Sequence, residues 1–220
     1  MPAAPLLTSL IPPVLLLPAL REGTHHLHER LESRLDLTAH LTSPSDYLTL
    51  LKRFYGFYAP LENALAAPKY AAAWADLGIA FEERRKAALL ESDLSALGLT
   101  AGEIAKLERC PACFEWDSAA ELMGCAYVLE GATLGGQVIG RHLERKLGFC
   151  PGSPGAQFFS GYGPRNGAMW QQFRRTAEEF AARQSTPQVI SDAVAAACRT
   201  FSSMEAWLLF DRESVYSCYD

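Results

Sequence analysis

Three histidines stand close together in residues 20–37, a segment whose apolar spacing predicts an amphipathic helix. Its inner stripe comprises Leu20, Thr24, Leu27, Leu31 and Leu35. His28 falls at the edge of that stripe, whereas His25 lies further round the helix and His26 points almost the opposite way. A neutral imidazole beside an apolar stripe can bind iron inside a dry pocket. The alternative is a core histidine whose ring nitrogens are satisfied by hydrogen bonds.

Arg21 adds a second polar group on nearly the same side of this helix. It precedes His28 by two turns, which corresponds to about 10 Å along a helix axis. That is about the distance from the iron of a heme to the edge that carries its carboxylates, with which a guanidinium can pair. The alternative is a solvated arginine, the usual environment of this side chain.

The longest predicted helix, residues 117–147, contains several glycines. Gly124, Gly131 and Gly135 fall on one face, and Gly136 follows them. An interior glycine costs a helix about 1 kcal/mol relative to alanine, so this alignment needs a reason. Either a flat group lies against the face and the helix bends there, or the face packs closely against another helix.

The elements that must position these residues are helices. Apolar residues recur at helical spacing along nearly the whole chain, and no segment alternates as a strand does. We therefore expect an all-α protein with one domain over residues 1–220, a core of about 18–210 and peripheral ends. The remaining helices are predicted to begin at Ser43-Pro44-Ser45-Asp46 and to cover about 69–74, 81–97, 102–109, 168–183 and 187–209.

Three features are expected to interrupt these helices. Pro60 should kink or end the helix that begins near Pro44. Ser92 and Asp93 are expected to interrupt the helix over 81–97. Residues 148–167 are rich in glycine and proline and should form a loop.

The composition limits the classes of partner. The 220 residues are 49% hydrophobic, enough for a substantial core, and the formal charge of -5 disfavours nucleic acid. The most apolar run near the N-terminus, Val14 to Leu17, is too short to span a bilayer and follows no basic region. We therefore expect a cytoplasmic protein that binds neither nucleic acid nor a membrane.

The cysteines offer two further possibilities. Cys110-Pro-Ala-Cys113 has the spacing of half a zinc site or of a redox pair, but no second pair with matching spacing follows it. Two free thiols in a surface loop are the favoured interpretation. Cys125, beside Gly124, is the only cysteine in the sequence placed where it could act as a nucleophile.

Two segments resemble motifs of the heme oxygenase family. Residues 20–28, LREGTHHLH, are similar to the proximal-helix motif, which ends in the iron-binding histidine. Residues 127–137, YVLEGATLGGQ, are similar to the distal-helix motif, whose glycines lie over the heme. The motifs stand about 100 residues apart, as the family requires, and the resemblance covers about residues 18–210. It is closest to the bacterial heme oxygenases that accompany bacteriophytochromes.

The resemblance implies a multihelical bundle with heme between a proximal helix and a kinked distal helix. It implies His28 as the axial iron ligand and Gly131 and Gly135 as residues of the distal face. The other residues implied to contact heme are Thr24, Ala132, Gly136, Arg21 near one propionate, and Arg174 near the other, with Arg175 in its place if the register differs by one.

The implied activity is the oxidative cleavage of heme to biliverdin, carbon monoxide and ferrous iron with O2. Electrons would come from an external protein, such as a ferredoxin or an NADPH-dependent reductase, because the sequence shows no dinucleotide or flavin fingerprint. The product would serve as bilin chromophore for a bacteriophytochrome.

Ala132 departs from the pattern of many heme oxygenases, which carry an aspartate there to anchor a proton-delivering water network. Thr133 or backbone carbonyls would have to hold such a network in this chain. Two alternative functions therefore stand beside the enzyme. One is a heme-binding or storage protein without catalysis, which Ala132 favours. The other is a thiaminase-like hydrolase of the same architecture, which would need a catalytic cysteine or a pair of carboxylates facing the pocket, with Cys125 as the candidate cysteine.

Overall fold

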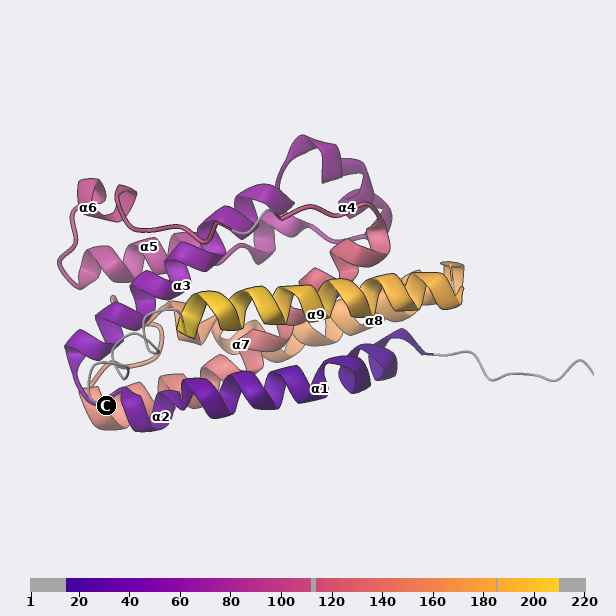
Figure 1. The fold of residues 1–220 in the computed structure, drawn as a ribbon. Helices are drawn as coiled ribbons and strands as arrows, with labels where there is room; N and C mark the ends of the chain where they lie inside the picture. The colour runs from indigo at the N-terminus through magenta and orange to yellow at the C-terminus, as the bar shows by residue number, and fades with distance from the viewer. Residues whose placement is uncertain (1–14, 112–113, 185, 210–220) are drawn as a thin grey trace, which may run out of the picture.

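The computed structural model describes residues 15–111, 114–184 and 186–209, and within these ranges every regular element is helical (Figure 1). The α-helices are α1 (Leu16–Leu35), α2 (Leu37–His40), α3 (Pro44–Leu65), α4 (Ala71–Leu77), α5 (Ala87–Ala96), α6 (Ala101–Ala105), α7 (Ala119–Leu147), α8 (Asn166–Gln184) and α9 (Pro187–Leu209). Short 3-10 turns are η1 (Pro68–Tyr70), η2 (Phe81–Arg84), η3 (Phe158–Ser160) and η4 (Gly163–Arg165). The all-α prediction is confirmed.

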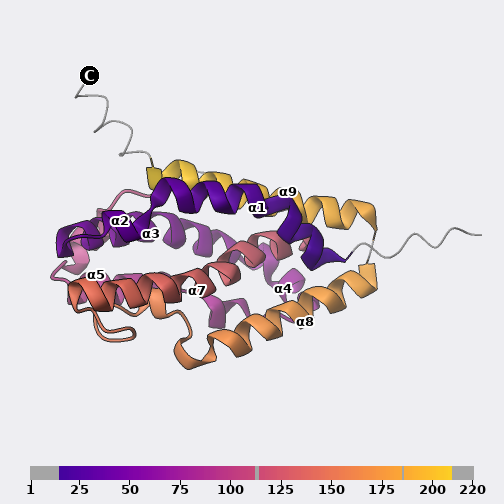
Figure 2. The ribbon, with the colours of Figure 1, turned by 90° about the horizontal axis from the view of Figure 1, so that it is seen from below.

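Helix α9 organises the bundle. Both α1 and α7 pack along it, but they make few direct contacts with each other. Figure 2 shows α1 and α9 on one side of the molecule and α7 and α8 on the other, with α7 bending part-way along its length. Helix α3 lies against α5 and α9. The long helices that carry the predicted site residues are therefore held through α9.

Helix α1 buries the stripe that its sequence predicts. All five of its members are buried, because a 3.6-residue repeat brings them to the side facing α9. At the outer edge of this interface, Glu205 of α9 accepts hydrogen bonds from Arg30 and Arg34 of α1. The Glu205 side chain is only 8% exposed.

The Glu205 ion pair predicts how stability depends on pH. The hydrogen bonds from Arg30, and then from Arg34, hold the pKa of Glu205 below its ordinary value of 4.5. A lowered carboxyl pKa stabilises the fold above the unfolded value, and that contribution is lost as the pH falls through the folded pKa. We expect Glu205→Gln to lower the thermal midpoint at pH 7, with a difference from the unmodified protein that shrinks below about pH 4.5. Thermal unfolding from pH 7 to 3 measures this, and a difference independent of pH would contradict it.

Helix α3 begins where the sequence predicts, with a capping box of Ser43 and Asp46, but it does not end at Pro60. Proline lacks the N–H that would bond to the carbonyl four residues earlier. That carbonyl, on Gly56, instead accepts the backbone N–H of Cys110 at 2.9 Å. A Cβ on Gly56 would lie 2.6 Å from the Glu108 carbonyl oxygen, so glycine permits this approach. The helix continues past Pro60 because another segment satisfies the freed carbonyl.

The predicted interruption at Ser92 and Asp93 is wrong, and the break lies at Arg85 and Lys86 instead. The buried carboxylate of Glu62 on α3 accepts the backbone N–H groups of Lys86, at 2.7 Å, and Ala87, at 3.0 Å. It therefore caps the start of α5 from another helix. A distant cap of this kind leaves no local sequence signal.

Helix α7 starts and ends close to the predicted positions. Within the described residues it is the one helix long and apolar enough to cross a membrane, and 56% of its apolar window is buried. A buried core helix passes the same test. Cys110 is buried, not at the surface as expected, while Cys113 lies outside the described residues.

Candidate functional site

A cavity of about 320 Å³ lies between α1 and α7. Its apolar lining comes from Leu31 and Leu35 of α1, Phe54 of α3, Val128 and Ile139 of α7, Phe201 and Met204 of α9, and the pair Phe158 and Phe159. Its polar lining is His28, Glu32, Asp36, Thr38, Tyr58, Lys86 and Thr133. A large apolar cavity with few polar groups is typical of a small-molecule site.

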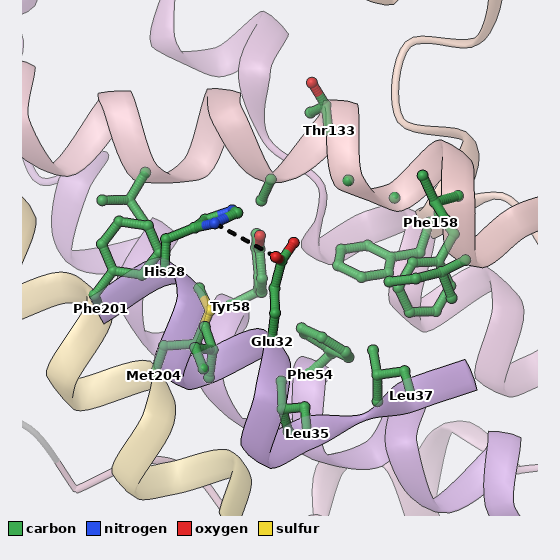
Figure 3. Close-up of a pocket in the computed structure, with 18 of the residues that line it drawn as sticks. His28, Glu32, Leu35, Leu37, Phe54, Tyr58, Thr133, Phe158, Phe201 and Met204 are labelled. Carbon is green, nitrogen blue, oxygen red and sulfur yellow. Dashed lines mark ion pairs between the residues drawn. The ribbon is translucent and has the colours of Figure 1, made fainter. Parts of the chain in front are cut away.

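His28 alone of the three predicted-helix histidines lines the cavity. Figure 3 shows its ring pointing from α1 into the space below α7, with Phe201 beside it. Its Nδ1 lies 3.6 Å from a carboxylate oxygen of Glu32, one turn further along α1. The ring of Phe201 meets it edge-on, with centroids 5.8 Å apart. The ion pair lies on the Nδ1 side of the ring, so Nε2 is the nitrogen through which His28 could bind a ligand.

The α7 wall combines small residues with one buried hydroxyl. Ala132, Gly135 and Gly136 line the cavity. A Cβ on Gly135 would meet nothing within 4 Å, whereas one on Gly136 would lie 3.0 Å from the Phe159 carbonyl oxygen. The Thr133 hydroxyl donates its proton to the Glu130 carbonyl oxygen at 2.7 Å, so this proton is not available for a hydrogen bond to a ligand. A flat ligand can therefore approach the backbone at Gly135.

The aligned glycines have different roles. Gly124 packs against α9, where an added Cβ would lie 2.8 Å from the carbonyl carbon of Ala193. Gly131 has open space around its Cβ position but does not line the cavity. Both interpretations of the alignment therefore apply, helix packing at Gly124 and a free cavity wall at Gly135.

Four other predicted site residues lie away from the cavity lining. Thr24 is buried and bonds to the Leu20 carbonyl oxygen at 2.7 Å. Arg21 is exposed on α1; burial raises the pKa of Tyr127 on α7, and the charge of Arg21 partly opposes that change. Arg174 and Arg175 are exposed on α8, which contacts α1. The structure thus groups His28 with the α7 residues, and it leaves the arginines on two neighbouring helices.

The aromatic wall formed by Phe158 and Phe159 depends on Asp93. This carboxylate is fully buried and accepts the backbone N–H groups of Gln157, at 2.9 Å, and Phe158, at 2.8 Å. Burial raises the pKa of Asp93, and these amides partly offset the effect. The residue expected to break a helix instead clamps the loop that closes the cavity.

This clamp predicts a large effect of one amide substitution. Both carboxylate oxygens accept the Gln157 N–H, and Oδ2 also accepts the Phe158 N–H, so the NH2 group of Asp93→Asn would face the Gln157 N–H in either orientation of the amide. We expect the free energy of unfolding to fall by about 1–3 kcal/mol, measured by urea denaturation. Ser92→Ala is the matched control, since it removes only an exposed bond to the Gln157 side chain and should change stability by less than about 0.5 kcal/mol. Equal stability of the two variants would contradict the clamp.

A buried charged cluster reaches the cavity through Lys86, and the sequence analysis did not detect it. Glu130 of α7 pairs with Arg84 and with Lys86, whose Nζ lies 3.3 Å from its carboxylate. The Tyr162 hydroxyl donates to the same carboxylate at 2.6 Å. The available signal was Glu130 itself, an acid within an apolar stretch of a predicted core helix, since buried acids are paired.

Cys125 does not suit a nucleophile. It is fully buried outside the cavity lining, and burial raises the pKa of its thiol to about 12. A thiol with so high a pKa remains protonated at neutral pH. Among the described residues, no group of three or more His, Cys, Asp or Glu side chains could hold a metal ion. Cys125 therefore lends no support to the hydrolase alternative, while Glu32 and Asp36 are the carboxylates that line the cavity.

The heme oxygenase family model matches residues 15–209. The chain is similar to solved heme oxygenases from Neisseria meningitidis (20% identity, TM-score 0.67, covering 89% of this chain and 91% of that one) and Leptospira interrogans (19%, 0.68, 89% and 98%). It is also similar to heme oxygenase 2 from Chlamydomonas reinhardtii (20%, 0.69, 89% and 96%). A search of curated proteins gives no match. At these identities the solved structures show a shared fold.

Proposed function

This chain belongs to the heme oxygenase family, and from that premise we propose that it binds heme in the His28 cavity and cleaves it oxidatively to biliverdin, carbon monoxide and ferrous iron. The proposal takes residues 1–220 as one domain in the cytoplasm. The observation that supports it best is the cavity itself, where one imidazole and a glycine backbone face an apolar space between two helices.

The residues present suit a heme. The lining is mainly aliphatic and aromatic, as a porphyrin requires, and the open Cβ position of Gly135 leaves room for a flat ring. We assign His28 as the axial iron ligand, with the carboxylate of Glu32 on the Nδ1 side of its ring. Bound heme supplies both the substrate and the iron that activates O2.

The distal side is assigned to α7. The helix could lie close to the ring because the residues that face it are small, namely Gly131, Ala132, Gly135 and Gly136. The aromatic side chains of the cavity would then contact the edges of the ring. Tyr58 lines the cavity, and burial raises its pKa, so its phenol stays protonated and can donate a hydrogen bond to water there. The backbone and Tyr58 would then orient water where the family aspartate is absent.

The open edge of the ring is assigned to the arginines. Arg21 on α1, and Arg174 or Arg175 on the neighbouring α8, would meet the propionates by charge pairing, and Thr24 is proposed to contact the heme beside Arg21. Exposed arginines at this edge would also leave a heme edge accessible to an electron-donor protein, such as a ferredoxin or an NADPH-dependent reductase. We propose further that the bilin product supplies a bacteriophytochrome.

A second candidate is a heme-binding protein without catalysis. Ala132 favours it, because this position offers no acid to anchor a proton-delivering water network. The two candidates share the cavity and differ only in turnover.

One experiment separates them. The purified protein is mixed with one equivalent of hemin, and its visible spectrum is followed after a reductant is added in air. Loss of the Soret band with growth of a broad red band supports the enzyme. A Soret band that persists with several electron donors supports the carrier, and no hemin binding would overturn both.

A further inference from the structure

The strongest unexplained feature near the cavity is the buried cluster around Lys86. Its Nζ donates to the Arg84 carbonyl oxygen at 2.8 Å and to the Tyr162 hydroxyl at 3.1 Å, and it lies 3.3 Å from Glu130. The Lys86 side chain is 4% exposed, yet it lines the cavity. Burying a lysine is costly even when it is paired, so its position calls for a function.

Lys86 is the one cation in the described lining of the cavity. The titratable groups packed around it are Arg84 of η2, Glu62 and Tyr58 of α3, Glu130 of α7 and Tyr162. His28 and Glu32 of α1, and Asp36 between α1 and α2, line the same cavity. Burial lowers the pKa of Lys86, and the nearby carboxylates of Glu130 and Glu62 oppose that change. The contacts that hold Nζ come from Glu130 of α7, from Tyr162 and from the Arg84 carbonyl oxygen.

We propose that Lys86, positioned by Glu130 and Tyr162, is the fixed positive charge that stabilises negative charge developing in the cavity on the side of α7. The inference rests on the proposed function and deepens it. Electron delivery to a heme with O2 builds negative charge in the cavity, and a preorganised cation in a water-poor site favours it. Ala132 is apolar and the Thr133 hydroxyl donates to the Glu130 carbonyl oxygen, so Lys86 supplies a positive charge that the lining residues of α7 do not provide.

Opposite charge changes give effects of opposite sign. Lys86→Met removes a positive charge from the cavity wall, whereas Glu130→Gln removes the neighbouring negative charge and leaves Lys86 and Arg84 facing a neutral amide. A role limited to packing would disturb the cavity without this reversal of sign. Tyr162→Phe keeps both charges and removes only the hydroxyl contact.

The experiment measures the pH midpoint of the acid–alkaline transition of the ferric heme complex by absorption, which needs no turnover. Positive charge favours the ionised form, so Lys86→Met should raise the midpoint by about 0.5 to 1 pH unit and Glu130→Gln should lower it by a similar amount. Tyr162→Phe should shift it less than either. Lys69→Met is the matched control, an exposed lysine paired with Glu115, and should leave the midpoint unchanged.

The outcomes are distinguishable from a failure of the proposed function. Suppose that the unmodified protein binds and degrades heme. If the midpoint then stays unshifted, or shifts with the same sign in both charge variants, the role of Lys86 is overturned and the proposed function stands. If Lys86→Met does not fold, the direction of the Glu130→Gln shift decides. Unmodified protein that binds no heme overturns the proposed function and this inference together.

Discussion

His28→Ala is expected to fold normally and to lose at least about 100-fold in heme turnover, more than is usual for residues that only support a metal ligand. The side chain is 52% exposed and contributes little to the core, and alanine favours the helix. What disappears is the imidazole aimed into the cavity (Figure 3). The ferrous complex should lose the iron–histidine band in its resonance Raman spectrum, and added imidazole should restore part of it.

His25→Ala provides the control for this experiment. It lies on the same helix, is also more than half exposed and pairs with Glu29 at 3.3 Å, but it does not line the cavity. Its heme spectrum and turnover should match those of the unmodified protein. Normal turnover and an unchanged band in His28→Ala would remove the basis for the assigned heme orientation.

Local periodicity was sufficient to predict the helices and the position of His28 relative to the buried stripe. The apolar pattern from Leu20 to Leu35 defines one face of α1. Helix geometry alone determines which side chains share that face, so tertiary contacts do not change it. The start of α3 was predictable for the same reason, because Ser43 and Asp46 cap it within four residues. Heme chemistry itself came from the resemblance of two motifs.

Features made by distant partners were not predictable. Glu62 caps α5 from another helix, so the start of α5 has no local signal in the sequence. Asp93 binds a loop more than 60 residues away, so it was predicted to interrupt a helix although its role is tertiary. Pro60 looked like a helix end because the sequence does not show that Cys110 satisfies the carbonyl of Gly56. The Lys86 cluster belongs to the same class, since its members come from four separate segments.

The glycines of α7 show a further limit, because one residue type serves two purposes on the same face. Gly124→Ala is expected to lower the free energy of unfolding by about 3 kcal/mol, since its Cβ would fall inside the contact distance of the Ala193 carbonyl group and the two helix backbones would have to separate. That is a large fraction of the 5–15 kcal/mol typical of a domain. Urea denaturation of the protein without heme measures it.

Gly131→Ala, two turns further along the same face, is the matched variant with the opposite expected sign. Nothing lies within 4 Å of its added Cβ, so replacing an interior helix glycine should raise stability by about 0.5–1 kcal/mol. Gly131 does not line the cavity in the protein without heme, but the proposed function counts it among the small residues of α7 that face the ring. Gly131→Ala should therefore weaken heme turnover while stabilising the fold, and an unaltered turnover would instead leave Gly135 and Gly136 as the residues that admit the ring.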